Sequence, residues 1–495
     1  MAVKKATASA KKSAKPVATK NQTVSPEKIS QYATLIAKKR DGNEFTKPEI
    51  RTIVDAIMKG EMPVSQQSAL LMAIYFKSLS GSEMAAFAEE MMFSGTTMDI
   101  DFARITDPKV SKTSTGGVGD KVSLSLAVVG AACGVVVPMM VSSDESTIIS
   151  LVDKMRAIPG VKTEMPHAEY AKLVGKVGTG IVSKSADISP VDASLTVLRK
   201  ETVTNENLHL LTSSILSRKY AEDSDGLIID LKWGSGSYIH DLEQAKLLAR
   251  YLTRVAKGMK RKSVALVTDA NQPIGDTVGT GMEIIETVQV LCGCGLNIAP
   301  KSKYEYLAGT QELLQEFGKE MVRLAGVAGS TLSAKQMIER TIKNRSGLKK
   351  FKEMIEKQGG STEWLTDLVA KFDAAVKAGK AEEFDWLKEQ KLFKPVTKIK
   401  HSCAAKRGYV HQINPLLIAK GVYELARRKD GSLDPAVGVC GLRKVGYQVK
   451  QGEALFEIRY NDEANLERAM EYFRYAYRLA PKRPADLPLI AERVA

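Results

Sequence analysis

The middle of the chain alternates between short apolar strands and longer helices, and this pattern restricts the fold more than any other feature. Two Leu/Ile/Val-rich runs, Gly226–Leu231 and Lys262–Thr268, each end in turn residues. Helical patterns of 10–18 residues follow these runs, at Asp241–Gly258 and Gly281–Leu291. Strands that alternate with helices of this length are typical of α/β proteins. The sequence therefore predicts an α/β layer.

Helical patterns precede this layer and also interrupt it. Between residues 25 and 94, apolar residues recur every three or four positions, and residues 190–222 are again helical. Thr46 and Glu49 have the spacing of a capping box, which predicts the start of a helix. We therefore expect a small helical domain that is built from two separate segments of the chain.

The last third of the chain changes character twice. A charged, mostly helical stretch runs to about Phe393 and reads as a solvated insert. Beyond Pro395, short strand patterns alternate and end in a helix over Asp462–Leu479. The fold class is α/β plus all-α. The predicted parts are a basic disordered tail (1–24), a helical domain (25–95 and 190–222), a mixed α/β domain (96–189 and 223–344), a charged helical insert (345–394) and a C-terminal α+β cap (395–495).

Charge and hydropathy exclude several classes of protein. The 495 residues hold 72 Lys and Arg against 57 Asp and Glu, a net charge of +15, and residues 1–22 carry six lysines and no acid. Such a tail cannot bury enough apolar surface to fold alone; a nucleic-acid-binding arm is the alternative use of it. The remaining positive charge lacks the clustering of a duplex-binding face and suits an anionic small substrate. No apolar run is long enough to cross a membrane, and no signal-peptide core is present, so we expect a cytoplasmic protein.

The five cysteines are too sparse for a disulfide framework. Cys292 and Cys294 are separated by one residue, which is too few for the usual zinc pair, and no second Cys/His pair follows. We therefore expect reduced thiols and no structural metal.

The stretch KTSTGGVGDKVS, residues 112–123, carries the clearest chemical motif. Its three glycines let backbone N–H groups approach an anion, and the helix that follows points its positive end at the same place. Lys112, Ser114 and Ser123 add one cation and two hydroxyl groups. The spacing differs from that of a Walker loop. The motif predicts a phosphate site, and a purely structural turn is the alternative.

This stretch resembles the D-K-x-S-T-G-G-V-G-D signature of the thymidine and pyrimidine-nucleoside phosphorylases. Further matches, in order, extend the resemblance over nearly all of residues 28–480. They are Ile36–Gly42, Asp153-Lys154, Ala157–Gly160, Leu198-Arg199, Thr212–Lys219, Asp230–Gly236, Gln272–Gly275, Arg407–Val410 and Asp434–Gly438. The resemblance implies a pentosyltransferase that converts a nucleoside and phosphate reversibly into free base and pentose 1-phosphate. It also implies a homodimer that pairs through the helical domain.

The resemblance also implies where the reactants bind. Phosphate binds on the α/β side and the pyrimidine base on the helical side of a cleft, and domain closure brings them together. The matching positions are Lys112, Ser114 and Ser123 for phosphate, and Arg199, Ser214, Arg218 and Tyr238 for the base. Lys112, Arg199 and Arg218 are the catalytic candidates. The family usually has Lys where this chain has Arg218, and Arg brings a planar fork instead of a point charge.

Three departures from the family pattern bear on activity. Thr113 stands where the family has His, which removes the favoured general acid. Val141 and Leu151 replace a Ser and a Thr that contact phosphate, and Glu145, beside Asp144, replaces an apolar residue near the base. Three interpretations stay open: the acids face solvent, the base preference has changed, or phosphorolysis is lost. In the last case the chain is a divergent relative that binds a nucleoside or nucleotide.

The resemblance extends to a cation position. Gly119, Ile274, Thr277 and Glu286 fall near positions where some family members bind a monovalent cation. Lys121 occupies the neighbouring position, where its ammonium group can replace the metal. We therefore expect no metal and no cofactor, with inorganic phosphate as a co-substrate.

Overall fold

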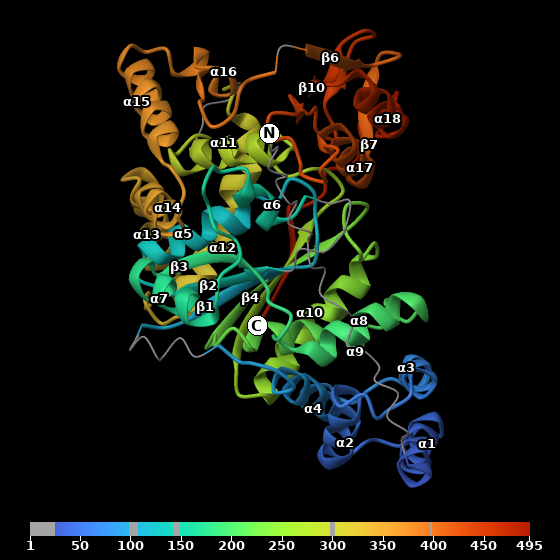
Figure 1. Ribbon diagram of the computed structural model, residues 1–495. Coiled ribbons are helices and arrows are strands. Elements are labelled where there is room, and N and C mark those ends of the chain that lie inside the picture. The colour runs from blue at the N-terminus through green and yellow to red at the C-terminus, as the bar shows by residue number, and fades with distance from the viewer. Residues whose placement is uncertain (1–24, 99–106, 142–148, 298–301, 397) are drawn as a thin grey trace, which may run out of the picture. The chain divides into compact units, whose positions relative to one another are not determined.

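The computed structural model describes residues 25–98, 107–141, 149–297, 302–396 and 398–495 (Figure 1). The chain divides into two compact units. The helical unit holds Met1–Thr97 and Ser185–Ala221, and the large unit holds Met98–Lys184 and Glu222–Ala495. The predicted basic tail and the two acids Asp144 and Glu145 lie outside the described residues. No helix in the described ranges is long and apolar enough to span a membrane.

The helical unit combines two segments of the chain, as predicted. Its helices are α1 (Pro26–Arg40), α2 (Lys47–Met58), α3 (Val64–Lys77), α4 (Gly81–Met92), α8 (Pro190–Glu201) and α9 (Leu208–Tyr220). The capping box predicted at the start of α2 is present, because the Thr46 hydroxyl accepts from the Glu49 backbone and the Glu49 side chain accepts from Thr46. Helix α9 of the second segment packs against α4 of the first. The two segments therefore share one core.

A four-stranded sheet in the order β1-β4-β5-β12 forms the centre of the large unit. Strands β1 (Val110–Ser114), β4 (Gly226–Trp233) and β5 (Lys262–Asp269) run parallel, and β12 (Ile490–Val494) pairs antiparallel with β5. The apolar run of β4 is completely buried, as a strand covered on both faces requires. The two predicted strands are confirmed, and both extend slightly further than their apolar runs.

Helices cover this sheet, and a second, parallel pair of strands extends the layer. The helices are α5 (Val122–Ala132), α6 (Leu151–Arg156), α7 (His167–Val177), α10 (Leu242–Gly258), α11 (Thr280–Leu291) and α12 (Ala308–Leu324), and the paired strands are β2 (Val137–Val141) and β3 (Thr179–Ser183). Helix α10 packs against β4 and β5, whereas α5 packs against β1 and β2. The predicted α/β layer is thus confirmed.

The segment predicted as a solvated insert is partly built into the core. Its helices are α13 (Thr331–Lys343), α14 (Ser346–Lys357), α15 (Glu363–Lys377) and α16 (Trp386–Glu389), with short 3-10 turns at Glu305–Leu307 and Ala381–Glu383. Helix α14 packs against α5 and α7, and Phe351, Met354 and Ile355 on it are fully buried. Helix α14 is amphipathic, with a buried apolar face beside its charged residues. The prediction of a solvated insert is therefore wrong for this helix.

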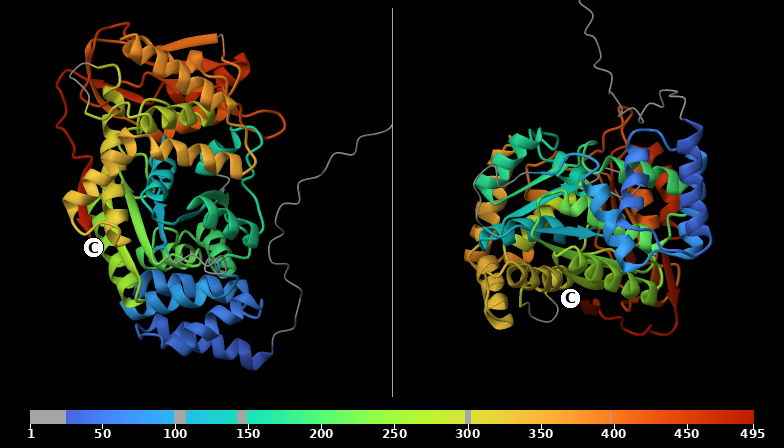
Figure 2. Two further views of the ribbon diagram at one scale, coloured as in Figure 1. Left: turned by 90° about the vertical axis from the view of Figure 1, so that its left-hand side faces the viewer. Right: turned by 90° about the horizontal axis from the view of Figure 1, so that it is seen from below.

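The C-terminal region contains two small sheets and two helices. One sheet joins β6 (Lys398–Cys403), β10 (Ala454–Tyr460) and β8 (Gly438–Cys440), and the other joins β11 (Tyr477–Ala480), β7 (Gly408–Ile413) and β9 (Gln448–Val449). The helices are α17 (Pro415–Ala426) and α18 (Glu463–Phe473). In Figures 1 and 2 the last red segment leaves this region and reaches the parallel strands, where it forms β12.

Two predictions for the chain end are therefore wrong. The final helix ends at Phe473 instead of continuing to Leu479, and β12 belongs to the central sheet instead of the cap. Phe473 and Tyr477 both pack against Phe456, with ring centroids 5.4 and 5.5 Å away. Their spacing of four residues imitates a helical stripe, although one residue lies on a helix and the other on a strand.

Candidate active site

The phosphate motif folds into a loop between the end of β1 and the start of α5. Its glycines are required by close packing. A side chain at Gly117 would place its Cβ 2.3 Å from Cδ of Lys232, and one at Gly119 would lie 2.7 Å from the carbonyl oxygen of Ile274. Both glycines also have positive φ angles, 95° and 72°. The loop can therefore lie directly against β4 and the segment 272–277 only because side chains are missing there.

A buried cluster of lysines and carboxylates lies beneath this loop. The Nζ atom of Lys112 lies 2.6 Å from Oγ of Ser123, 2.9 Å from Oδ2 of Asp230 and 3.3 Å from Oδ2 of Asp120. Lys232 donates to the same Asp230 carboxylate, at 2.8 and 3.0 Å. The side chains of both lysines are at most 1% exposed. Two ammonium groups thus share one buried carboxylate at the carboxyl end of the parallel strands.

The charged groups of this cluster stabilise the charged forms of Lys112 and Asp120. Burial lowers the pKa of Lys112, but the negative charges of Asp120 and Asp230 outweigh it and raise the pKa above its ordinary value. Burial raises the pKa of Asp120, yet Lys112, Lys232 and Lys154 together bring it well below its usual range. Lys112 and Asp120 are therefore both charged near neutral pH. An anion that binds here meets fixed ammonium groups that already have protein partners.

The two hydroxyl groups of the motif are in different situations. Ser123, at the start of α5, contacts Lys112 and Asp120, whereas the Ser114 hydroxyl donates to the carbonyl oxygen of Gly116 at 3.1 Å. The structure brings Lys112, Ser114 and Ser123 together around the loop. Tyr238 also lies beside it, because Gly116 forms a β-bridge with Ser237. The Tyr238 side chain is 65% exposed.

Lys232 is a candidate that the sequence interpretation missed. It lies inside the matched stretch Asp230–Gly236, but no role was assigned to it. Asp230 and Lys232 are two residues apart, so they lie on the same face of β4. Lys232 could have been recognised from the charged pair on one face of an otherwise apolar strand, since buried charges in proteins are usually paired.

The departures from the family pattern also have definite positions. Thr113 is half-buried on β1, Val141 ends β2, and Leu151 is the first residue of α6, where it is buried. Val and Leu side chains cannot donate a hydrogen bond to an anion. Ser150, directly before Leu151, caps α6 with its hydroxyl. At positions 141 and 151, this chain therefore supplies fewer hydrogen-bond donors to an anion than the family pattern does.

Three of the four base-binding candidates lie in the helical unit, and Tyr238 lies in the large unit. Arg199 lies on α8, and Ser214 and Arg218 lie one turn apart on α9. The Arg218 Nε atom is 3.2 Å from Oδ2 of Asp192 and donates to the carbonyl oxygen of Ser214. Arg199 is 3% exposed and donates through Nη2 to the carbonyl oxygen of Asn205 at 2.8 Å. Two arginines are thus held close together by α8 and α9.

Arg199 retains unused hydrogen-bonding capacity. Its buried Nε has no hydrogen-bond partner among the residues that the structure describes. The pKa of its guanidinium is lowered to about 10, mainly by burial and also by the charge of Arg218, although Asp192 opposes both effects. A buried donor without a partner is costly, so such a group is typical of a site that an acceptor on a ligand completes.

Lys121 occupies the predicted cation position. Its Nζ atom lies 2.7 Å from the carbonyl oxygen of Ile274, 3.0 Å from that of Thr277 and 3.0 Å from Oε2 of Glu286. The lysine side chain is 0% exposed. Because the ammonium group takes these oxygens, the residues present do not fit a monovalent cation. Across the described ranges, no group of three or more His, Cys, Asp or Glu side chains is arranged to hold a metal.

The C-terminal region fixes the segment that surrounds Lys121. Lys444 donates through Nζ to the carbonyl oxygens of Pro273 and Gly275, and the Asp276 carboxylate accepts from the backbone of Gly441 at 3.0 Å. Burial lowers the pKa of Lys444 to about 8, and the nearby Lys121 contributes to this. These contacts connect the C-terminal region through segment 272–277 to the phosphate loop.

Three family descriptions match successive parts of the chain. Residues 33–95 match the helical bundle domain of a glycosyl transferase family, and residues 106–344 match its a/b domain. Residues 409–480 match the pyrimidine nucleoside phosphorylase C-terminal domain. The matches thus cover the helical unit's first segment, most of the α/β layer and the C-terminal region.

Individual proteins are similar over most of the chain. A pyrimidine-nucleoside phosphorylase of Geobacillus stearothermophilus is 34% identical over 432 residues, covering 87% of this chain and 92% of that protein. A thymidine phosphorylase of Sinorhizobium medicae is 31% identical over 466 residues, covering 93% and 98%. Among solved structures, anthranilate phosphoribosyltransferase of Thermus thermophilus matches with a TM-score of 0.50 and 15% identity, over 65% of this chain and 98% of that one. This last likeness concerns the fold alone.

Proposed function

Since the chain belongs to the glycosyl transferase family that includes the pyrimidine-nucleoside and thymidine phosphorylases, we propose that it catalyses reversible phosphorolysis of a pyrimidine nucleoside. The products are the free base and a pentose 1-phosphate. The observation that carries the proposal is the buried Lys112, held in its charged form beneath the glycine loop. A fixed cation beneath a glycine-rich loop that leads into a helix is suited to an incoming phosphate.

In the proposed reaction, one oxygen of phosphate forms a bond to C1′ of the sugar. The bond from C1′ to the ring nitrogen of the base breaks, and its electron pair leaves with the base. Lys112, Ser114 and Ser123 bind the phosphate and orient the attacking oxygen. Fixed positive charge is most effective where negative charge develops.

The departing base needs compensation for the charge it acquires. We assign this role to Arg199 and Arg218, since both are cationic and Arg199 has a buried Nε without a partner in the described part of the chain. Ser214 adds a hydroxyl group one turn before Arg218 on α9. Arginine donors match the carbonyl oxygens of a pyrimidine ring in a planar arrangement. Tyr238 is proposed as a further base-binding residue.

A second candidate function is supported by the replaced residues. Thr113, Val141 and Leu151 supply neither an acid near pH 7 nor donors to phosphate comparable to the family residues. A chain with these replacements can bind a nucleoside or nucleotide without converting it. This alternative keeps the base-binding residues and loses the phosphate chemistry.

One experiment separates the two functions. The purified protein is incubated with thymidine, uridine, cytidine and a purine nucleoside, each with and without phosphate, and free base is measured by chromatography. Base release that requires phosphate and favours pyrimidines supports the first function. Nucleoside binding by calorimetry without any base release establishes the second.

We also propose that the chain forms a homodimer through the helical unit, in a reducing, cytoplasmic environment. Helix α3 exposes large apolar side chains, among them Val64 at 54% and Phe76 at 74%. All five cysteines are free thiols, in keeping with the proposed environment. Phe76→Ser should shift the sedimenting species toward monomer, whereas Leu332→Ser, which alters a 66% exposed leucine of the large unit, should not. A dimer unaffected by Phe76→Ser would contradict this interface.

A further inference from the structure

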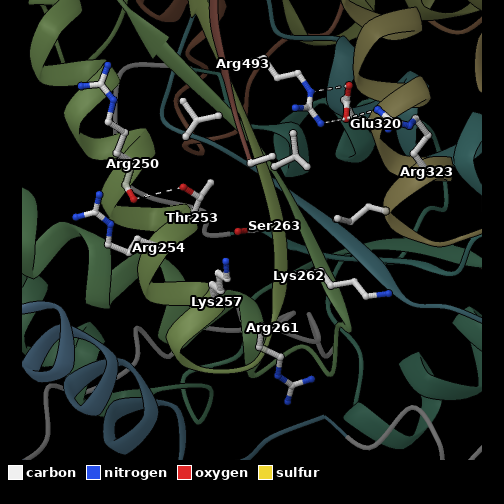
Figure 3. Close-up of a pocket in the computed structure, with 14 residues that line it drawn as sticks. Arg250, Thr253, Arg254, Lys257, Arg261, Lys262, Ser263, Glu320, Arg323 and Arg493 are labelled. Atoms are coloured by element: carbon white, nitrogen blue, oxygen red, sulfur yellow. Dashed lines mark hydrogen bonds and ion pairs between the residues drawn. The ribbon is translucent and has the colours of Figure 1, made fainter. Parts of the chain in front are cut away.

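A basic pocket of about 640 Å³ lies at the edge of the central sheet, within the large unit (Figure 3). Its walls come from the second half of α10, the start of β5, the end of α12 and the end of β12. Figure 3 shows arginine and lysine side chains on several sides of it. The pocket therefore brings together segments that are far apart in the sequence.

The walls are strongly positive. Helix α10 contributes Arg250, Arg254 and Lys257, and further cations come from residues 261 and 262, from α12 and from β12. Glu320 is the one acidic side chain in the lining that the structure describes. Clusters of one sign of charge in a concave surface focus the electrostatic field and raise the local concentration of counter-ions.

Ion pairs within the protein neutralise only some of these cations. Arg493 forms two hydrogen bonds with the buried Glu320 carboxylate, at 2.9 and 2.8 Å, and Arg250 pairs with Glu492 at 3.2 Å. Arg254 and Lys257 form no ion pair with any residue in the described ranges, and both are exposed. At least two cations on one wall thus point their charge at solvent without a protein partner.

Stabilisation by the helix dipole explains the position of only one of the cations on α10. A positive side chain in the last turn of a helix is stabilised by the helix dipole, and Lys257 lies in the last turn of α10. This effect fades beyond the last turn. Arg250 and Arg254 lie eight and four residues before the end of α10 at Gly258, so helix capping does not account for them.

The lining also restricts the chemistry of the ligand. It contains no aromatic side chain on which a base would stack, and proteins that bind single-stranded nucleic acid rely on such stacking. Its cations include several arginines, whose planar fork matches two oxygens of a phosphate group. We propose that this pocket binds a small polyphosphate anion, that is, a compound with two or more linked phosphate groups that the pocket recognises through those groups.

This pocket is separate from the phosphate loop. Lys262 starts β5, whereas Asp230 pairs with Leu266, four residues further along that strand. Four residues of a strand span about 13 Å. No residue of the pocket takes part in the contacts of Lys112. The proposal therefore does not depend on the activity proposed above.

The test uses the full-length protein and sodium tripolyphosphate in isothermal titration calorimetry. The double variant Arg254→Gln/Lys257→Gln should bind tripolyphosphate about tenfold more weakly or worse, because charge-assisted hydrogen bonds to anions are the strong ones. The matched control is Lys172→Gln/Lys176→Gln, which neutralises two exposed lysines of α7 and should bind like the parent. Thermal melting verifies that both variants are folded.

Two further arms assign the binding to this pocket. With inorganic phosphate added to fill the phosphate loop, the parent should still bind tripolyphosphate and the Arg254→Gln/Lys257→Gln variant should still bind it more weakly. A short single-stranded RNA should bind no differently to the parent and the Arg254/Lys257 double variant. The proposal is overturned if tripolyphosphate does not bind the parent, if the double variant binds it as tightly as the parent, or if only RNA binding responds to the double variant.

Discussion

Replacing Lys112 with Met tests the buried charge cluster most sharply, because Met keeps the length of the side chain and removes its charge. The ammonium group makes a hydrogen bond to Asp230 at 2.9 Å, one to Ser123 at 2.6 Å and a longer contact to Asp120. Asp230 keeps Lys232 and Thr268 as partners, so its charge stays compensated. Loss of one partner of a buried pair costs about 3–5 kcal/mol. With this remaining compensation we expect a loss of about 3 kcal/mol in the free energy of unfolding.

The same change should reduce activity through phosphate. We expect the KM for phosphate of Lys112→Met to rise at least about tenfold, which corresponds to one charge-assisted hydrogen bond. The matched control is Lys39→Met in the helical unit, which breaks a buried ion pair of 2.6 Å with Glu83. It should lower stability without raising the KM for phosphate. A folded Lys112→Met with parental kinetics would refute the assignment of Lys112.

Acid unfolding gives a second measurement on the same variant. The pKa of Asp120 is depressed in the folded protein, so its contribution to stability is present above the unfolded pKa of about 4 and is lost as pH falls below it. Lys112→Met removes part of this depression. The difference in stability between parent and variant should therefore shrink between about pH 4 and pH 2, as measured by urea unfolding. A difference that is constant over this range would show that Asp120 and Lys112 are not coupled.

Three further perturbations have definite expected outcomes. Arg199→Ala should weaken nucleoside binding in calorimetry by about tenfold or more and leave phosphate affinity unchanged, and equal loss for both ligands would contradict its place in the base site. Lys121→Ala leaves Glu286 and two carbonyl oxygens without their ammonium partner, so its melting temperature should rise in KCl relative to choline chloride at equal ionic strength. The melting temperature of the parent should show no such difference. If the melting temperature of the variant does not respond to potassium, Lys121 does not stand in place of a cation. The pKa of Lys444 is about 8 in the folded protein and near 10.4 in an unfolded chain, so the unfolded state holds more protons between these values. The free energy of unfolding of the parent relative to Lys444→Met should therefore rise by about 1–3 kcal/mol between pH 8 and pH 10, and a flat difference would contradict the buried position of this lysine.

Local patterns in the sequence were sufficient where a single segment determines its own structure. The helices around Ile50 and Leu248 bury one regular stripe, and the capping residues Thr46 and Asp241 fix their starts. The strands β4 and β5 contain the buried apolar runs Leu227–Ile229 and Val264–Val267, as expected of strands that are covered on both faces. In these segments, the period of the apolar residues corresponds directly to burial.

The errors arose where contacts distant in sequence decide the structure. Strand β12 forms only because β5 offers a free edge, and its own residues are partly exposed and partly charged. The aromatic residues Phe473 and Tyr477 share the partner Phe456 and thereby imitate a helix. Local spacing cannot reveal a pairing of this kind.

The candidate site shows the same division. Lys112, Ser114 and Ser123 lie within one motif and were predicted from it. Lys232 and Lys444 reach the site from β4 and from the C-terminal region, and only the folded chain shows their contacts with Asp230 and Gly275. The unpartnered Nε of Arg199 is likewise a property of packing, because any surface arginine would satisfy this atom with water.

Phosphorus NMR on a reaction mixture shows directly whether the protein transfers a pentose from a nucleoside to phosphate. The purified protein is mixed with thymidine or uridine and inorganic phosphate, and free base is quantified in parallel by chromatography. We expect a new phosphate-ester signal from pentose 1-phosphate that grows in equal amount with the free base, and no base release when sulfate replaces phosphate. Release of base without phosphate, or a correctly folded protein that binds nucleoside and forms no phosphate ester, would contradict this expectation.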